Sequence, residues 1–185
     1  MITLNEIFGY PFTTIVVSLI WARIRFFKIG STTPNGIARL YDPVVIIHLA
    51  TVYYFIYTVD LRLNAITIVG ILLLMVSLVT FWWAIFTAKK IGFALSGGIE
   101  KLLVTGPYSL VRHPFYTSYC FTWIGTSIVF NSIVLWSTLV YLFAFYYIVA
   151  VREENIILKS IYSGEYEAYQ KRVGMFLPRI PKWIK

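Results

Sequence analysis

The sequence of 185 residues has little cysteine and little charge. Cys120 is its single cysteine, so the sequence offers neither a disulfide framework nor a thiolate metal cluster, and we expect Cys120 to be a small apolar residue inside a helix. Charged residues make up 13% of the sequence and hydrophobic residues 59%, whereas a soluble domain has roughly 25% charged residues. The composition predicts an integral membrane protein that crosses the bilayer several times.

Nucleotide-binding and hydrolase motifs are also missing. The sequence contains no GxxxxGK[ST], GxGxxG or GxSxG pattern, which argues against a P-loop enzyme, a Rossmann domain and a serine hydrolase. Its two histidines, His48 and His113, are too dispersed for a catalytic zinc site, so we expect no metal. His48 lies in the apolar run VVIIHLA and is expected to be a hydrogen-bonded side chain within the membrane rather than a ligand.

Five apolar segments predict membrane-spanning helices, because such a helix needs roughly 20 residues. They cover about 7–25, 43–59, 65–88, 114–130 and 132–151. The first is expected to stay in place as an anchor, since no basic leader or cleavage site precedes it. Asn131 alone separates the last two segments, which predicts a tight helical hairpin. We therefore expect an all-α integral membrane protein with one membrane-embedded domain over residues 1–185.

The charges of the connecting segments predict the orientation of the protein. Basic residues exceed acidic ones between the first two spans, in the 89–113 loop and in the 152–185 tail, whereas Asp60 and Arg62 cancel between the second and third spans. Loops rich in Lys and Arg face the cytoplasm, so the tail and the C-terminus are expected there. The net charge of +8 is explained by this topology and by attraction to membrane lipids, with no nucleic-acid partner.

Hairpin geometry predicts that four polar residues meet at one membrane face. His113 is 18 residues before Asn131 and Glu153 is 22 residues after it, so at about 1.5 Å per residue both lie roughly 27 to 33 Å from the turn. Arg112 and Glu154 are their neighbours. Taken alone, Arg112 and His113 are equally compatible with the interfacial end of a helix. Glu153 and Glu154, taken alone, are compatible with a solvated helix end.

The tail is predicted to form amphipathic helices on the cytoplasmic face. Apolar and aromatic residues recur there at helical spacing, at Ile157, Ile161, Tyr166 and Tyr169. We expect Gly164 to break these helices and Pro178 and Pro181 to end them.

The order of the motifs resembles a known family. LVTGPYSLVRHPFY, the apolar hairpin, REEN and GEYEAYQKRVGMFLPRIP follow one another between residue 101 and about residue 181, and this arrangement is similar to the isoprenylcysteine carboxyl methyltransferase family and its relatives among the phospholipid N-methyltransferases. The resemblance implies a membrane-embedded methyltransferase that holds S-adenosyl-L-methionine outside any Rossmann fold, in its cytoplasmic loop and tail.

The resemblance also implies site residues. The cofactor-binding residues would be Lys101, Leu102, Leu103, Val104, Tyr108, His113, Pro114, Phe115, Tyr116, Glu153 and Glu154. Arg152 would contact the acceptor, and Arg112, His113, Glu153 and Arg152 are the candidate catalytic residues.

The chemistry of the cofactor suits these residue types. Glu153 or Glu154 would bind its ammonium group, and Arg112 or His113 its carboxylate. Methyl transfer to a carboxylate needs in-line positioning and exclusion of water, whereas transfer to an amine also needs a proton acceptor, for which Glu153 or His113 is available. A lipophilic acceptor would enter from the bilayer.

Several alternatives remain open at the level of the sequence. The expected acceptor is the carboxylate of a lipidated, isoprenylcysteine-like molecule, and the alternative is N-methylation of a phospholipid or another small amphiphile. A membrane reductase that uses NADPH and a non-catalytic membrane protein are rivals from other classes. The oligomeric state is not predicted.

Overall fold

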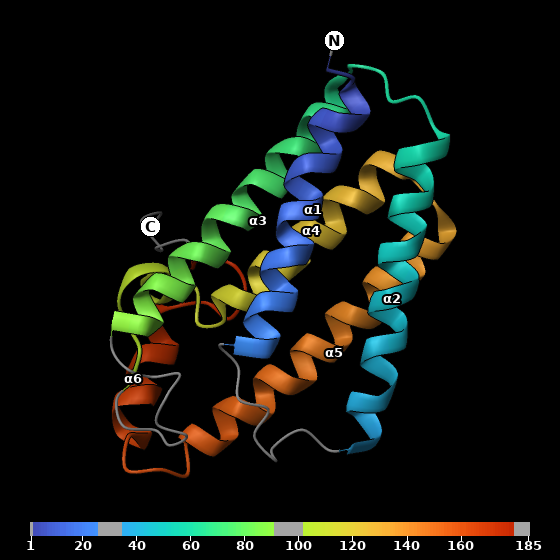
Figure 1. Ribbon diagram of the computed structural model, residues 1–185. Coiled ribbons are helices and arrows are strands. Elements are labelled where there is room, and N and C mark those ends of the chain that lie inside the picture. The colour runs from blue at the N-terminus through green and yellow to red at the C-terminus, as the bar shows by residue number, and fades with distance from the viewer. Residues whose placement is uncertain (1, 26–34, 91–101, 180–185) are drawn as a thin grey trace, which may run out of the picture.

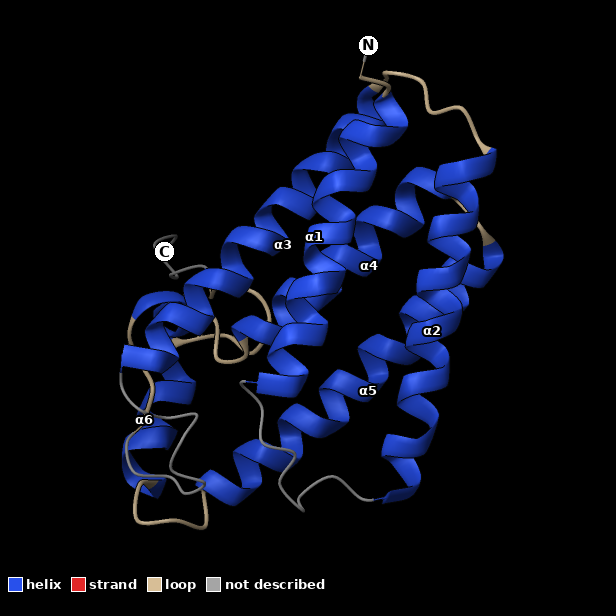
Figure 2. Cartoon of the chain, viewed as in Figure 1, coloured by secondary structure: helices blue, strands red, loops and turns tan. Residues whose placement is uncertain are grey.

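The computed structural model describes residues 2–25, 35–90 and 102–179, and its regular elements there are helices (Figures 1 and 2). They are α1 (Leu4–Arg25), α2 (Asn35–Thr58), α3 (Ala65–Lys90), the short 3₁₀ helix η1 (Gly106–Ser109), α4 (Pro114–Phe130), α5 (Ile133–Ile157) and α6 (Ser163–Arg172). Across the described ranges, Val111 and Gly174 add one isolated parallel bridge. The all-α fold predicted from the sequence is confirmed.

Three of these helices are long and apolar enough to cross a membrane, namely α1, α3 and α5. Helix α4 has 17 residues, fewer than the roughly 20 that a span needs, and α2 begins with a polar stretch. The protein therefore has the helices of an integral membrane protein, and a total of five spans stays a prediction.

Helix α2 begins at Asn35 rather than near residue 43, and Pro43 lies inside it. The added turns are polar, and Asp42 accepts two hydrogen bonds from Arg23 at the end of α1, one of them from Nη2 at 2.8 Å. Hydropathy detected only the apolar part of this helix, because residues 35–42 include Asn35, Arg39 and Asp42.

Helices α3 and α4 pack closely along their length, and α1 packs on α3 while α2 packs on α5. The closest approach of α3 to α4 is at two glycines. A Cβ atom on Gly70 would lie 3.3 Å from the carbonyl oxygen of Gly125, and a Cβ on Gly125 would lie 3.2 Å from that of Gly70. Small residues of this kind allow membrane helices to approach closely, so the two glycines fix how α3 and α4 cross.

The predicted helical hairpin is confirmed. Asn131 ends α4 in the left-handed conformation, with φ at 43°, and its side-chain oxygen accepts a 3.0 Å hydrogen bond from Nε1 of Trp136. Asparagine tolerates this conformation at the end of a helix. Ser132 then caps α5 by accepting a hydrogen bond from the backbone of Val134. The turn places the start of α4 and the end of α5 at the same end of the bundle (Figure 1).

The tail differs from its prediction in two places. Helix α5 continues to Ile157, and the break falls in the turn before Ser163. Gly164 does not break the helix, because it lies inside the first turn of α6. A Cβ atom at this position would meet no atom within 4 Å. Ile161 is in the turn and 90% exposed, so it is not part of an apolar face. Tyr166 and Tyr169 are buried as predicted.

His48 is fully buried in α2, and both of its ring nitrogens have hydroxyl partners. Its Nδ1 lies 2.7 Å from Oγ1 of Thr138, and its Nε2 lies 2.9 Å from Oγ1 of Thr126. This confirms a hydrogen-bonded side chain that ties α2 to α4 and α5. Cys120 is likewise a buried, free residue of α4, as expected.

Candidate functional site

A cluster of charged side chains lies where α4 begins and α5 ends. Arg112 donates two hydrogen bonds to the carboxylate of Glu154, from Nε at 2.8 Å and from Nη2 at 3.2 Å. Nε2 of His113 lies 2.9 Å from Oε1 of the same carboxylate. The two residues before α4 thus meet the last turns of α5, as the hairpin geometry predicted.

The tail completes this cluster. Nε2 of Gln170, in α6, donates to Oε2 of Glu154 at 2.7 Å, and Nη1 of Arg112 donates to the carbonyl oxygen of Val173 at 2.6 Å. The backbone N–H groups of Arg112 and His113 donate to the carbonyl oxygens of Gly174 and Met175 at 2.9 and 3.1 Å. One buried arginine and a short backbone pairing therefore hold the tail against the membrane helices.

Gly174 is required where the tail turns beside Arg112. A Cβ atom at this position would lie 2.0 Å from the carbonyl oxygen of Leu177, which is far inside van der Waals contact. Farther along, Oγ1 of Thr117 donates to the carbonyl oxygen of Phe176 at 3.0 Å. The tail is thus fitted to α4 over several consecutive residues.

The two neighbouring glutamates have different environments. The side chain of Glu154 is 7% exposed and accepts hydrogen bonds from Arg112, His113 and Gln170. The side chain of Glu153 is 46% exposed, accepts a 2.6 Å hydrogen bond from the hydroxyl of Tyr116, and has Oε2 3.5 Å from Nδ1 of His113. Glu154 is therefore occupied by protein donors, whereas the carboxylate of Glu153 remains open to solvent and to a ligand.

His113 lies between the two carboxylates, and its environment changes its pKa. Burial of the imidazole works to lower the pKa of His113, but the hydrogen bonds and negative charges of Glu153 and Glu154 outweigh burial and raise it above the ordinary value. The imidazolium is therefore favoured in the folded protein, and it adds positive charge to the cluster.

Aromatic rings pack around His113 and Tyr116, next to the exposed carboxylate of Glu153. The ring of Tyr116 is stacked between those of His113, at a centroid distance of 5.6 Å, and Tyr146, at 5.3 Å. The ring of Phe176, from the tail, meets His113 edge-on at 6.0 Å. Protein rings thus cover both faces of Tyr116 and hold its hydroxyl beside Glu153.

Five of the residues implied by the resemblance meet in this cluster, namely Arg112, His113, Tyr116, Glu153 and Glu154. Pro114 starts α4 and is buried, and Arg152 is exposed on the same turn of α5 as the glutamates. Lys101 lies outside the described residues.

The other implied residues lie around the cluster rather than in it. Leu103 and Tyr108 are buried in a core with residues of α1 and α3, and Phe115 packs toward the same core. Leu102 packs against the buried tyrosines of α6, and Val104 is exposed. The hydroxyl of Tyr169 donates to the carbonyl oxygen of Tyr108 at 2.5 Å, so this segment is also joined to the tail.

Two residues of the cluster were missed at the sequence level. Gln170 and Val173 both lie in the tail motif GEYEAYQKRVGMFLPRIP, but nothing in its spacing marks a glutamine side chain or a valine carbonyl as partners of a charge pair. Only the fold of the tail brings them to Glu154 and Arg112.

The described residues thus combine three helices that are long and apolar enough to cross a membrane with a charge cluster at one end of the bundle. Residues 65–165, from the start of α3 into α6, match the model of the phospholipid methyltransferase family. The chain belongs to this family. No solved structure matches the chain.

Two curated relatives are similar to part of the chain. One is the nickel-cobalt-cadmium resistance protein NccN of Alcaligenes xylosoxydans xylosoxydans, 34% identical over 80 residues, which cover 43% of this chain and 37% of the relative. The other is the cobalt-zinc-cadmium resistance protein CzcN of Cupriavidus metallidurans, 34% identical over 87 residues, which cover 46% of this chain and 40% of the relative. The similarity thus extends over about two fifths of the relatives' length.

Proposed function

We propose that this protein is an S-adenosyl-L-methionine-dependent methyltransferase of the membrane, whose acceptor is a lipid-borne group that enters from the bilayer. Membership of the phospholipid methyltransferase family supports the reaction class. The observation that supports the location of the site is the open carboxylate of Glu153, which lies beside the stacked rings of His113 and Tyr116.

The residues of the cluster fit the cofactor in one respect. The ammonium group of the cofactor needs an anion, and the carboxylate of Glu153 is half exposed although it accepts a hydrogen bond from Tyr116. When bound, the cofactor supplies an electrophilic methyl group.

Arg112 takes a positioning role in this proposal rather than binding the cofactor carboxylate. Its Nε and Nη2 are hydrogen-bonded to Glu154, and its Nη1 to Val173. Among the described residues, His113 and Arg152, which is exposed beside Glu153, are cations available for the carboxylate. The pair of Arg112 and Glu154 then holds the tail in place.

Two acceptors are compatible with this site. The carboxylate of an isoprenylcysteine-like molecule is already ionised, so it needs only alignment and a dry environment. The amine of a phospholipid, which the family match favours, must also lose a proton. Glu153 supplies a proton acceptor for this second reaction, because its carboxylate is half exposed and negatively charged.

The test begins with binding. S-adenosylhomocysteine should raise the thermal stability of the detergent-purified protein, by about 2.7 kcal/mol at 100 times the Kd, and NADPH should not. Glu153→Gln should remove this shift, and Glu167→Gln, at an exposed glutamate of α6, should retain it. A shift with NADPH alone, or with neither ligand, would refute the proposal.

The acceptor is tested separately by transfer of a labelled methyl group from S-adenosyl-L-methionine. A farnesylcysteine analogue and phosphatidylethanolamine are offered in parallel. Label on the first identifies the carboxylate reaction, and label on the second identifies N-methylation. Label on neither, with cofactor binding intact, would refute the assignment to these two acceptors.

A further inference from the structure

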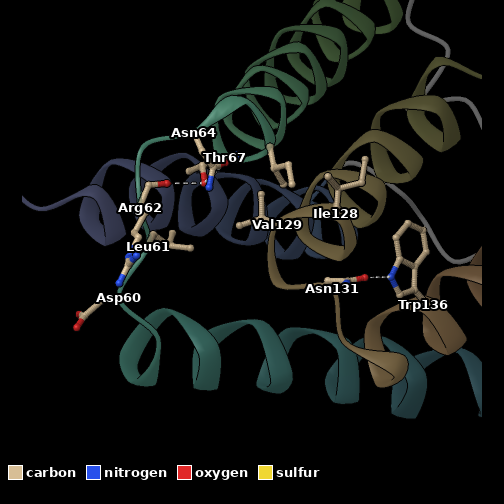
Figure 3. A pocket seen from close by; sticks show the side chains of 10 residues that line it. Asp60, Leu61, Arg62, Asn64, Thr67, Ile128, Val129, Asn131 and Trp136 are labelled. Atoms are coloured by element: carbon tan, nitrogen blue, oxygen red, sulfur yellow. Dashed lines mark hydrogen bonds between the residues drawn. The ribbon is translucent and has the colours of Figure 1, made fainter.

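A second site lies at the opposite end of the bundle from the charge cluster. Helix α4 separates His113 from Asn131, and its 17 residues span about 25 Å. Beside Asn131 there is a cavity of about 490 Å³ (Figure 3), within the range of roughly 300–1,000 Å³ found for small-molecule sites. Its walls come from the connection between α2 and α3 and from the turn between α4 and α5.

One wall of this cavity is held by hydrogen bonds from α1. Nδ2 of Asn5 donates to the carbonyl oxygens of Ile56 and Val59, each at 2.7 Å, and its Oδ1 accepts from the backbone of Leu61 at 2.9 Å. Asn64 caps α3 by accepting from the backbone N–H of Thr67 at 2.9 Å. The connection therefore has a defined shape without any ligand.

The facing wall of the cavity is also held by a hydrogen bond. Asn131, in its left-handed conformation, accepts the hydrogen bond from Trp136, and the two residues lie on the other side of the cavity from Asp60 and Arg62 (Figure 3). Between the walls lie apolar side chains, including Ile66 and Ile128. Binding to a preformed cavity costs less conformational entropy, because few groups of the protein must be ordered when the ligand binds.

The charges on the rim have opposite signs. Asp60 and Arg62 both line the cavity and are exposed. Neither side chain forms an ion pair within the described part of the chain. The first turn of α3 begins three residues after Arg62, and the N-terminus of a helix favours a negative charge nearby. The rim thus offers one place for an anion and one for a cation.

We propose that this cavity binds the headgroup of a zwitterionic phospholipid. The phosphate binds at Arg62 and the amine at Asp60, and the first carbons of the acyl chains lie on Ile66 and Ile128. The ends of the apolar helices α3 and α5 border the cavity, and its rim includes Trp136, a residue type that favours the membrane–water interface. A purely anionic lipid would bring negative charge to Asp60 without a compensating cation.

Free phosphoethanolamine carries the same phosphate and ammonium groups as the lipid. The apolar side chains of Ile66 and Ile128 favour the lipid over phosphoethanolamine, because they can contact its acyl chains. The proposed lipid site does not depend on methyl transfer, because the cavity and Glu153 lie at opposite ends of the bundle. A lipid bound here would hold the α2–α3 connection and the α4–α5 turn together at this face.

The experiment measures binding of short-chain phosphatidylethanolamine to the delipidated protein in detergent, with phosphoethanolamine, inorganic phosphate and short-chain phosphatidylglycerol as comparisons. Arg62→Gln and Asp60→Asn should each weaken the binding of phosphatidylethanolamine about tenfold, the effect of losing one hydrogen bond to a charged group. The matched controls are Lys159→Gln and Glu167→Gln, which remove exposed charges at the other end of the molecule and should leave binding unchanged.

Four outcomes would overturn the proposal. Three of them concern the rim variants and the comparison ligands. They are unchanged affinity in both rim variants, equal affinity for phosphatidylglycerol, and phosphoethanolamine or phosphate binding as tightly as the lipid. Binding that is lost in Glu153→Gln but retained in Arg62→Gln would place the lipid at the charge cluster, and it would likewise overturn the proposal. Thermal melts without lipid identify any variant that fails to fold, and since both rim residues are exposed we expect unchanged melts.

Discussion

Replacing Glu154 with Gln removes one buried negative charge and keeps the shape of the side chain. The side chains of Glu154 and Arg112 are 7% and 9% exposed, so the arginine would be left charged and shielded from water. A Gln side chain offers one acceptor oxygen where the carboxylate has two, and its NH2 group would face donors, either those of Arg112 Nε and His113 or those of Arg112 Nη2 and Gln170. Removing one partner of a buried ion pair costs about 3–5 kcal/mol.

We expect the lower end of this range, because Arg112 keeps its hydrogen bond to the carbonyl of Val173. In a chain of this size 1 kcal/mol corresponds to roughly 2–4 °C in Tm, so about 3 kcal/mol corresponds to roughly 6–12 °C if the bundle and tail unfold together. The loss of stability should appear first as local unfolding of α6 and of the residues that follow it, because the charge cluster holds these to the bundle.

The neighbouring residue provides the control. Glu153→Gln makes the same chemical change one position earlier, but its side chain is 46% exposed, and exposed ion pairs contribute about 0–1 kcal/mol. Thermal melts in detergent and hydrogen exchange of residues 163–176 should therefore separate the two variants, with faster exchange only in Glu154→Gln. Equal melts and equal exchange in both would refute the role given to Glu154.

The remaining predictions concern the histidines, a glycine and the topology. Since the pKa of His113 is raised in the folded protein, the stability from its ion pairs is complete below about pH 6.5 and is lost as pH rises through the folded-state pKa; melts across this range should show the loss in the wild type and not in His113→Gln. His113→Ala should abolish methyl transfer, whereas His48→Ala should lower Tm and leave the activity of the folded fraction nearly unchanged, and equal activity losses would contradict this. Gly106→Ala should destabilise by about 1–2 kcal/mol, because φ is +60° and a Cβ would lie 2.6 Å from Oγ1 of Thr87, whereas Gly164→Ala should be neutral or slightly stabilising in chemical denaturation. A tag on the C-terminus should be accessible to protease only from the cytoplasmic side, and access from the other side would overturn the predicted orientation.

The meeting of Arg112 and His113 with the end of α5 could be predicted because two rules determine it. The rise of an α-helix sets how far each residue lies from Asn131, and a turn this short forces the helices to run back along each other. Neither rule depends on the rest of the protein. Hydropathy failed for the beginning of α2, because the first turns of this helix contain polar residues such as Arg39 and Asp42.

The different environments of Glu153 and Glu154 could not be predicted. In the sequence the two residues are equivalent neighbours, and about 100° of helical rotation separates their side chains. Which one turns toward Arg112 depends on the rotation of α5 about its axis, and this rotation depends on how α5 packs against α2 and α4.

The position of the tail links its docking to the proposed binding of the cofactor. Phe176 stands edge-on to His113, and Arg112 holds the backbone beside it, so the aromatic surface beside Glu153 is complete only when the tail is docked. A ligand that binds this surface then stabilises the docked tail, because it binds the docked state alone. S-adenosylhomocysteine should therefore slow hydrogen exchange in residues 163–176 of the wild type, and Glu154→Gln should weaken its binding without Glu154 touching it. Cofactor affinity that is unaffected by Glu154→Gln, with faster exchange in the tail, would show that the tail is not part of the binding surface.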